Sequence, residues 1–463
     1  MLYAFLKRCI GALLDVFYRR TSLGGEIPDD GPIVIVANHP NGMVDPMLMG
    51  RISKRHVRFL GKAPLFKLPL VGAIMKNVGA LPVYRVQDNP GEQSKNEETF
   101  TACYEALEQT SAICIFPEGV SHSIPHLQRM KTGAARIALG AELRNGFKLG
   151  IRIVPVGLTY RNKHRFRGQV ATEVGTPIPI ADLKELAETD LRKASDLLTS
   201  RIGEAISALT INVEKWEDVP VLEAAAEIWA REKGLSLTSD EKEKRLRRFA
   251  EGLRVMREHD LARVERLRDR VASFNERLKA MGANPGNLDA RYTPGTVVRF
   301  FFQNLFAVIL GLPLATFGVV AFYIPYQVPR MLITVIDPPL DIVATVKVAS
   351  ILVIFPLWYT GCVLAAAVFG GWEWALGTAV LMPTCGWYAI RFLERREEAL
   401  EDTAIFFRLG LRGARKERLL GRRAELAAEI EAVANDLEKL RVEGKAPQVP
   451  AGMISSEERL PGG

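Results

Sequence analysis

The chain contains few cysteines and few histidines. Its five cysteines form no CxxC pair and show no metal-ligand spacing; they are Cys9, Cys103, Cys114, Cys362 and Cys385. Their odd number and wide scatter argue against a disulfide framework and predict a reducing compartment. The six histidines are also spread along the chain without ligand spacing, so we expect no bound metal.

Residues 1–20 do not predict a secretory signal. Within residues 1–20, Lys7, Arg8 and Asp15 interrupt the apolar stretch, and no small-residue cleavage site follows. Apolar side chains recur there at helical spacing, with cations on the remaining faces. We therefore expect residues 1–24 to form an amphipathic helix at a bilayer interface. The alternative interpretation is a first core helix of a soluble domain.

Charge is absent from three long stretches near the C-terminal end. Residues 300–329, 348–372 and 374–390 contain no charged side chain. The first two exceed the roughly 20 residues needed to cross the hydrocarbon core, and the third is at the lower limit. This local feature explains a mean hydropathy of +0.06, which is high for a soluble protein. We predict a transmembrane region over residues 296–392.

The net charge of +8 indicates an anionic partner. Nucleic acid, anionic lipid headgroups and phosphorylated substrates all fit a basic balance. The charges lie on helices of mixed sign, and the sequence has no zinc-type or RRM-type motif. We therefore expect no nucleic-acid partner.

Short apolar runs alternate with helical patterns in the first part of the chain. The runs occupy residues 32–37, 78–84, 111–116 and 151–159, and helical patterns cover 95–109 and 129–143. This alternation predicts an α/β domain over residues 25–180. Active residues in such sheets tend to lie in loops just beyond the strand ends.

The remaining chain divides by composition. We expect a charged helical region, forming a hairpin or a short coiled pair that packs on the α/β domain, then the transmembrane region, a basic helical tail and a disordered C-terminus. These parts are assigned to residues 181–295, 296–392, 393–440 and 441–463.

The first loop whose residues could take part in catalysis is Asn38-His39-Pro40-Asn41-Gly42-Met43-Val44-Asp45-Pro46. His39 follows a predicted buried strand, and Asp45 lies within the same tight loop. Such a pair supplies a base and a carboxylate that orients it, so an external hydroxyl can be activated without a protein nucleophile. The alternative is a capped turn in which Asp45 is the N-cap of a helix over 46–52.

Two further elements could bind a substrate. The segment Phe116-Pro117-Glu118-Gly119-Val120-Ser121-His122 also follows a strand; Gly119 permits close backbone approach and Glu118 offers a carboxylate. Basic residues beside glycines, namely Lys62, Arg85 and Lys131, are suited to holding a phosphate. Taken singly, these features are also explained by an ordinary turn and by solvated surface charges.

The order of these elements resembles the glycerolipid acyltransferase superfamily, the PlsC-like fold. That family carries N-H-x4-D, G-x-I-x-x-x-R, F-P-E-G and V-P-V blocks in this order. Here the second block corresponds to residues 79–85, the third to 116–119 and the fourth to 154–156. The resemblance covers roughly residues 30–180, and it implies a mixed sheet flanked by helices.

Two departures from the common pattern indicate a branch of that family. Five residues separate His39 from Asp45, one more than usual, and Val120-Ser121-His122 replaces the T-R-S that follows F-P-E-G in many lysophosphatidate acyltransferases. Both features look like the glycerol-3-phosphate and dihydroxyacetone-phosphate acyltransferase branch. The segments 131–134 and 209–213 also resemble that branch, as do the helical insert and the transmembrane helices that follow it.

The resemblance implies a role for each matching residue. His39 would be the general base and Asp45 its orienting partner. Lys62 and Arg85 would bind the acceptor phosphate, and Glu118 and Gly119 would position glycerol hydroxyls. Further substrate-binding candidates are Ser121, His122 and Lys131. No cofactor is implied, because acyl-CoA or an acyl-carrier protein would be a co-substrate.

The expected function is that of an integral membrane O-acyltransferase of phospholipid biosynthesis, with membrane lipids, the acyl donor and a glycerophosphate acceptor as partners. A 1-acylglycerol-3-phosphate acyltransferase is one alternative. A non-catalytic lipid-binding membrane protein that keeps the fold is another. The basic tail after residue 391 predicts a cytosolic C-terminal side, shared by the catalytic domain. An even number of crossings then requires one of the three apolar stretches to be re-entrant or interfacial.

Overall fold

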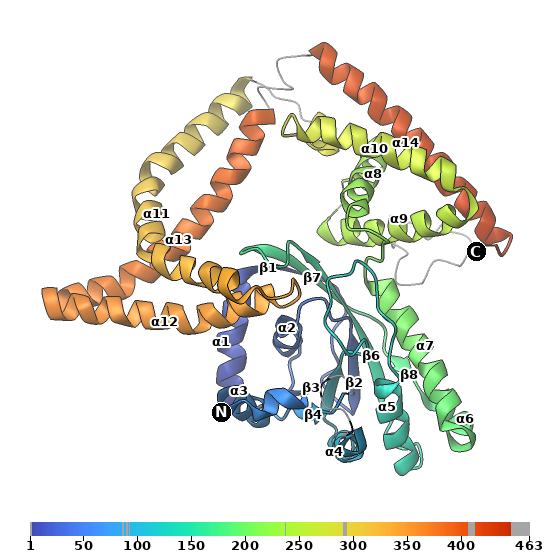
Figure 1. Ribbon diagram of the computed structural model, residues 1–463. Coiled ribbons are helices and arrows are strands. Elements are labelled where there is room, and N and C mark those ends of the chain that lie inside the picture. Colours follow the sequence, from blue (N-terminus) through green and yellow to red (C-terminus); the bar gives the residue numbers. More distant parts are fainter. Residues whose placement is uncertain are drawn as a thin grey trace.

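The computed structural model describes residues 2–85, 88, 91, 93–236, 238–289, 294–405 and 413–445. Three parts are visible: a sheet covered by helices, a group of charged helices, and long apolar helices that project away from the sheet (Figure 1). The predicted disordered C-terminus lies outside the described residues from position 446 onward.

One mixed sheet forms the centre of the first part. Its strands are β1 (Tyr18–Gly24), β2 (Ile33–Ala37), β3 (Val57–Lys62), β4 (Leu81–Val83), β5 (Ala112–Ile115), β6 (Arg152–Arg161), β7 (Gly168–Val174) and β8 (Ile178–Pro179). The order is β1-β7-β6-β2-β5-β3-β4, with β8 beside β6. Neighbours from β6 to β4 are parallel, whereas β7 and β8 run antiparallel to β6. The expected mixed sheet flanked by helices is confirmed.

The first strand was not expected. Residues 18–24 were assigned to the N-terminal helix, but helix α1 (Leu2–Phe17) ends before them and they pair with β7 in parallel. The pairing satisfies the backbone groups on one side of this edge strand, and Tyr18 and Leu23 are buried there. The helix itself has a mixed surface, since Leu14 and Phe17 lie in the core while Phe5 is 63% exposed.

Both faces of the sheet are apolar, as parallel strands covered on both sides require. In β2, Val34 and Val36 point to a core shared with helices α4 (Asn96–Glu108), α5 (Gly133–Arg144) and α7 (Leu191–Leu209). The alternate residues of β2 join a second core with α1 and α2 (Val44–Ile52). Helix α7 therefore packs on the sheet, although the sequence placed it beyond the α/β domain.

Shorter helical elements complete this part. They are α3 (Pro69–Asn77), α6 (Lys184–Thr189) and 3-10 turns at Ala63–Lys67, Gln93–Lys95 and Ala181–Leu183. A further 3-10 turn, Pro285–Asp289, belongs to the charged helices.

The charged region forms a helical module rather than a simple hairpin. Its helices are α8 (Asp218–Glu232), α9 (Ser239–His259), α10 (Leu261–Lys279) and α14 (Gly413–Val442). Leu426 and Ile430 of α14 share a core with Phe274 of α10, so the C-terminal tail completes this module. The fully buried Arg247 of α9 joins the module to the sheet through an ion pair with Glu173 of β7.

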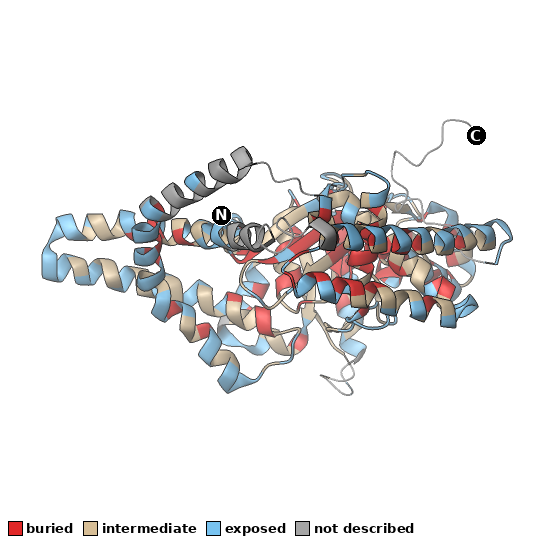
Figure 2. Ribbon diagram, turned by 90° about the horizontal axis from the view of Figure 1, so that it is seen from above, coloured by how far each residue is buried: buried red, intermediate tan, exposed pale blue. Residues whose placement is uncertain are grey.

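The apolar stretches form α11 (Pro294–Ile336), α12 (Val343–Gly370) and α13 (Trp372–Ile405). Within the described residues, Gly311–Ile336 and Val343–Gly370 are long and apolar enough to cross a membrane. Figure 1 shows that α11 bends sharply, and it contains three internal prolines. Figure 2 shows many exposed residues along these helices, whereas buried residues concentrate around the sheet. The first turns of α12 join the sheet's core through Ala344 and Val348.

Candidate active site

The predicted site residues gather at one edge of the sheet. Strands β2, β3, β4 and β5 are parallel, so their carboxyl ends meet there. Direct contacts join the loops that follow: the His122 amide donates to the His39 carbonyl over 3.1 Å, and Arg85 Nη1 donates to the Gly119 carbonyl over 2.6 Å. The fold therefore brings together motifs that are far apart in the sequence.

His39 and Asp45 form a hydrogen-bonded pair. Asp45 Oδ2 lies 2.8 Å from His39 Nδ1 and also accepts the Asn41 amide over 2.7 Å. Because an ionised carboxylate only accepts, Nδ1 carries the ring proton and Nε2 remains the basic nitrogen. The imidazole stacks on Phe116, with ring centroids 4.2 Å apart, which fixes its orientation.

Asp45 lies inside helix α2 and does not cap it. The N-cap position is occupied by Met43, which makes no side-chain capping bond. The Asp45 carboxylate is fully buried and points instead toward the imidazole and the sheet. The alternative interpretation of Asp45 as a helix cap is wrong. Its carboxylate instead accepts hydrogen bonds from three donors inside the domain.

The third donor is Tyr160, near the end of β6. Its hydroxyl donates to Asp45 Oδ1 over 2.6 Å, so both carboxylate oxygens are occupied. Burial and the neighbouring Asp45 charge raise the pKa of Tyr160 well above its usual value, which keeps this hydroxyl protonated. Sequence analysis missed Tyr160; the only local sign is a polar residue at the end of an apolar run.

The loop before Asp45 is held from two sides. The Asn38 side chain exchanges two hydrogen bonds with the backbone of Leu158 in β6, at 2.8 and 2.9 Å. The Asn41 side chain donates to the Tyr18 hydroxyl over 3.0 Å. These contacts fix where the loop leaves the sheet, and hence where the imidazole lies.

Lys163 connects the His39–Asp45 loop to the segment that contains Ser123. Its ammonium donates to the Pro40 carbonyl and, over 2.8 Å, to Ser123 Oγ. Burial lowers the pKa of Lys163, and the charges of Asp45 and Asp341 oppose that effect. The sequence contains no motif that marks this lysine.

Glu118 connects the His39–Asp45 loop to the Phe116–His122 loop. Its side chain is buried; Oε1 accepts the His39 amide over 3.0 Å, and Oε2 pairs with His122 Nε2 and accepts the Gln128 amide. Both oxygens therefore have protein partners. The role expected for Glu118 toward glycerol hydroxyls stays a prediction, and the structure assigns it a positioning role between the loops.

Two cationic side chains approach Gly119. It has φ of +72°, and a Cβ added there would lie 2.5 Å from Lys131 Nζ, so the lysine side chain crosses directly over the glycine. Arg85 approaches the same residue from β4 and is also paired with Asp88. Lys62 lies exposed at the end of the adjacent strand β3. Arg85 and Lys131 are thus converging cations, as a phosphate site needs.

The turn between α11 and α12, with the first turn of α12, reaches both of these loops. Ser121 Oγ donates to Asp341 Oδ2 over 2.5 Å, and the Met43 amide donates to Thr345 Oγ1 over 3.1 Å. Gly42 has φ of +40°, and a Cβ added there would lie 2.9 Å from the Asp341 carbonyl. The apolar helices therefore begin in contact with the predicted site, which sequence analysis did not foresee.

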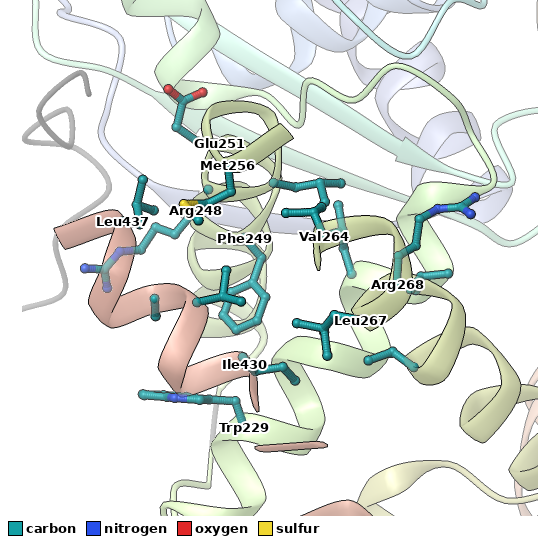
Figure 3. A pocket seen from close by; sticks show the side chains of 18 of the residues that line it. Trp229, Arg248, Phe249, Glu251, Met256, Val264, Leu267, Arg268, Ile430 and Leu437 are labelled. Atoms are coloured by element: carbon teal, nitrogen blue, oxygen red, sulfur yellow. The ribbon is translucent and has the colours of Figure 1, made fainter. Parts of the chain in front are cut away.

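A separate apolar cavity lies between the four helices of the helical module. Its volume is about 280 Å³, and Figure 3 shows Trp229, Phe249, Leu267, Ile430 and Leu437 around it. Arg268 at its rim is already paired with Asp218 over 2.7 Å. The cavity contains none of the predicted site residues.

Comparisons with known proteins agree on the first part of the chain. Residues 21–159 match the family model described as Acyltransferase. Glycerol-3-phosphate O-acyltransferase 2 of Saccharomyces cerevisiae is 31% identical over 140 residues, which is 30% of this chain and 19% of that protein. Glycerol-3-phosphate O-acyltransferase 1 of the same yeast is 24% identical over 321 residues, covering 50% of this chain and 42% of the relative.

Two further similarities are to a chloroplastic protein and to a solved structure. The chloroplastic 1-acyl-sn-glycerol-3-phosphate acyltransferase LPAT1 of Arabidopsis thaliana is 28% identical over 129 residues, covering 28% of this chain and 32% of that protein. The crystal structure of PlsC from Thermotoga maritima aligns with a TM-score of 0.32 and 19% identity, over 44% of this chain and 80% of that one. The chain thus spans 19% to 42% of the length of these three curated relatives.

Proposed function

We propose, from the match of residues 21–159 to the Acyltransferase family model, that the chain is a membrane-bound O-acyltransferase. It transfers a fatty acyl group from an acyl thioester to a hydroxyl of glycerol 3-phosphate or a related glycerophosphate, in phospholipid biosynthesis. The observation that carries the proposal is the His39–Asp45 pair, with its basic Nε2, beside the Phe116–Gly119 loop. The similarity to two yeast glycerol-3-phosphate acyltransferases supports the acceptor class.

The proposed reaction needs one base and no protein nucleophile. His39 Nε2 takes the proton of the acceptor hydroxyl as its oxygen attacks the thioester carbonyl. The tetrahedral intermediate then collapses, the C–S bond breaks, and the imidazolium returns its proton to the thiolate. Asp45 stabilises the imidazolium, and Tyr160 holds Asp45 in place. The acyl-CoA or acyl-carrier protein is a co-substrate, and no cofactor takes part.

Arg85, Lys131 and Lys62 form the proposed site for the acceptor phosphate. Arg85 and Lys131 both approach Gly119, and Lys62 lies at the end of the neighbouring strand. Charge-assisted bonds to phosphate are strong enough to position the glycerol moiety beside His39. Ser121 and His122 remain further substrate-binding candidates on the same loop.

A second acceptor is 1-acylglycerol 3-phosphate. The similarity to LPAT1 of Arabidopsis thaliana favours it. Against it, Val120-Ser121-His122 replaces the T-R-S sequence and thus lacks its arginine. Both acceptors use the same base and phosphate site, so a direct comparison of rates separates them.

We also propose that α12 and α13 cross the bilayer as a hairpin and that α11 enters and leaves on one side. Tyr326 in α11 contacts Phe166 of the β6–β7 loop, and a Cβ on Gly311 would lie 2.2 Å from the Tyr388 hydroxyl in α13. The 28 residues of α12 span about 42 Å at the usual rise, more than the hydrocarbon core. The basic tail after residue 391 supports a cytosolic position for the catalytic side.

The decisive experiment uses membranes that contain the full chain or its His39→Ala variant. Labelled acyl-CoA or labelled acyl-carrier protein is offered with glycerol 3-phosphate, dihydroxyacetone phosphate or 1-acylglycerol 3-phosphate. The variant should lose about 10²–10⁴-fold in transfer rate, the usual worth of a general base. His259→Ala, an exposed histidine of the helical module, is the matched control and should keep full activity.

The outcomes distinguish the candidates. Transfer to one acceptor, lost in His39→Ala, supports both the mechanism and that acceptor. Activity retained in His39→Ala rejects the mechanism. Failure to acylate any of the three acceptors, with either donor type, favours a non-catalytic lipid-binding protein of this fold.

A further inference from the structure

The β6–β7 loop, residues 162–167, is fastened to all three apolar helices. Phe166 meets Tyr326 of α11 edge-on, with ring centroids 6.0 Å apart. The Lys347 ammonium in α12 donates to the His164 carbonyl. Arg167 Nε donates to Glu394 of α13 over 2.5 Å. This loop therefore marks where the catalytic domain meets the proposed bilayer surface.

Three cations at this junction, Arg165, Arg330 and Lys347, have no ion-pair partner within the described residues. Arg165 and Arg330 are exposed, and both exert their charge on Lys347. In the described part of the chain neither arginine has an acidic partner, in contrast to Arg167. Burial, together with the charges of Lys347, Arg165 and Lys163, lowers the pKa of His164. Like charges held together in this way are stabilised by a bound anion.

The surroundings of these cations are apolar. Tyr323, Tyr326 and Met331 of α11 are 59%, 50% and 65% exposed. Arg330 is the first charged residue after the charge-free stretch of α11. Lys347 is the last charged residue before the charge-free stretch of α12. Cations flanked by exposed aromatic and aliphatic side chains are typical of the headgroup level of a bilayer. A free anion in solution would gain nothing from the apolar surface.

We propose that Arg165, Arg330 and Lys347 bind the phosphate of an anionic phospholipid headgroup, whose acyl chains lie against the exposed faces of α11 and α12. This lipid is bound at the junction and is not the acyl acceptor. The inference rests on the membrane placement proposed above and is independent of the acyl-transfer chemistry. Lys163, which acts on His164 and donates to the Pro40 carbonyl, connects the lipid site to the catalytic loop.

The test measures lipid binding by the full-length protein in a neutral detergent. Dansyl-labelled phosphatidylglycerol is titrated by energy transfer from tryptophan, and unlabelled phosphatidylglycerol, phosphatidylcholine and inorganic phosphate are the competitors. The variant combines Arg165→Gln, Arg330→Gln and Lys347→Gln. The matched control removes three exposed cations elsewhere, through Lys148→Gln, Arg192→Gln and Lys193→Gln.

Each interfacial cation contributes about a fivefold gain in affinity, so the triple variant should bind on the order of 100-fold more weakly. The control variant should bind like the unmodified protein. Phosphatidylglycerol should compete well, and phosphatidylcholine and inorganic phosphate poorly. If the triple variant unfolds, the single variant Arg165→Gln provides the same test with an expected loss of about fivefold.

Three results overturn the proposal. Equal affinity of the triple variant and the control shows that these cations do not hold the lipid. Efficient competition by inorganic phosphate shows a site for a soluble anion. Failure of the unmodified protein to float with neutral liposomes rejects the membrane placement and this inference with it, while leaving the acyl-transfer assay unaffected.

Discussion

Tyr160→Phe removes one hydroxyl from the centre of the predicted site and leaves the ring in place. In the native protein this hydroxyl donates to Asp45 Oδ1 over 2.6 Å, while Oδ2 accepts from His39 and Asn41. Asp45 is fully buried, so water does not replace the lost donor. One oxygen of a buried carboxylate is then left without a hydrogen bond.

The expected cost follows from that geometry. A hydrogen bond to a charged group contributes about 1.5–3 kcal/mol, and a buried acceptor left unsatisfied loses all of it. If the misoriented imidazole loses this much transition-state stabilisation, kcat/KM falls by about 10- to 150-fold. The pKa of Tyr160 is raised far above neutrality, so its hydroxyl stays protonated and the loss should be constant across the neutral pH range.

The assay compares kcat/KM and the thermal unfolding midpoint of Tyr160→Phe with those of Tyr104→Phe. Tyr104 is a partly buried tyrosine of α4, on the opposite face of the sheet, and its loss should leave kcat/KM unchanged. If Tyr160→Phe keeps kcat/KM within about twofold and also keeps its unfolding midpoint, the buried bond does not support Asp45 and the reasoning fails.

Three other changes test separate parts of the structure. Gly119→Ala forces a side chain onto a φ of +72° and into Lys131, so it should cost about 1–3 kcal/mol of stability and raise KM for the phosphate acceptor, as kinetics and thermal unfolding can check. Gly252→Ala adds a methyl group that faces Leu437, which can shift into the adjoining cavity; it should raise the free energy of unfolding by about 0.5–1 kcal/mol, and a lower melting temperature would contradict this. The folded-state pKa of His164 lies below its unfolded value near 6.5, so the stability present above that pH should be lost as pH falls through the folded pKa. His164→Gln should therefore make the melting temperature less dependent on pH between pH 7 and 5. An unchanged dependence of melting temperature on pH would count against the cationic cluster.

The local pattern was sufficient for the central strands and their loops. The run Ile33–Ala37 is apolar at every position because β2 is covered on both faces, and such runs predict buried strands. His39 and Glu118 come directly after β2 and β5, so their meeting at one sheet edge followed from parallel strands alone. Strand β1 could not be predicted in this way, because residues 18–24 show no apolar alternation and become a strand only by pairing with β7.

By itself, the sequence predicted strands β2, β4, β5 and β6, the apolar helices and the motifs that carry the proposed chemistry, but not strands β1, β3, β7 and β8. Tertiary structure alone decided which side chains support those motifs: Tyr160 reaches Asp45 across 115 residues, and Ser121 reaches Asp341 across 220. It also decided that α14 packs in the helical module and that the turn before α12 contacts the Phe116–His122 loop. The physical reason is that periodicity depends on neighbours within a few residues. A hydrogen bond between distant residues instead depends on how the whole sheet closes.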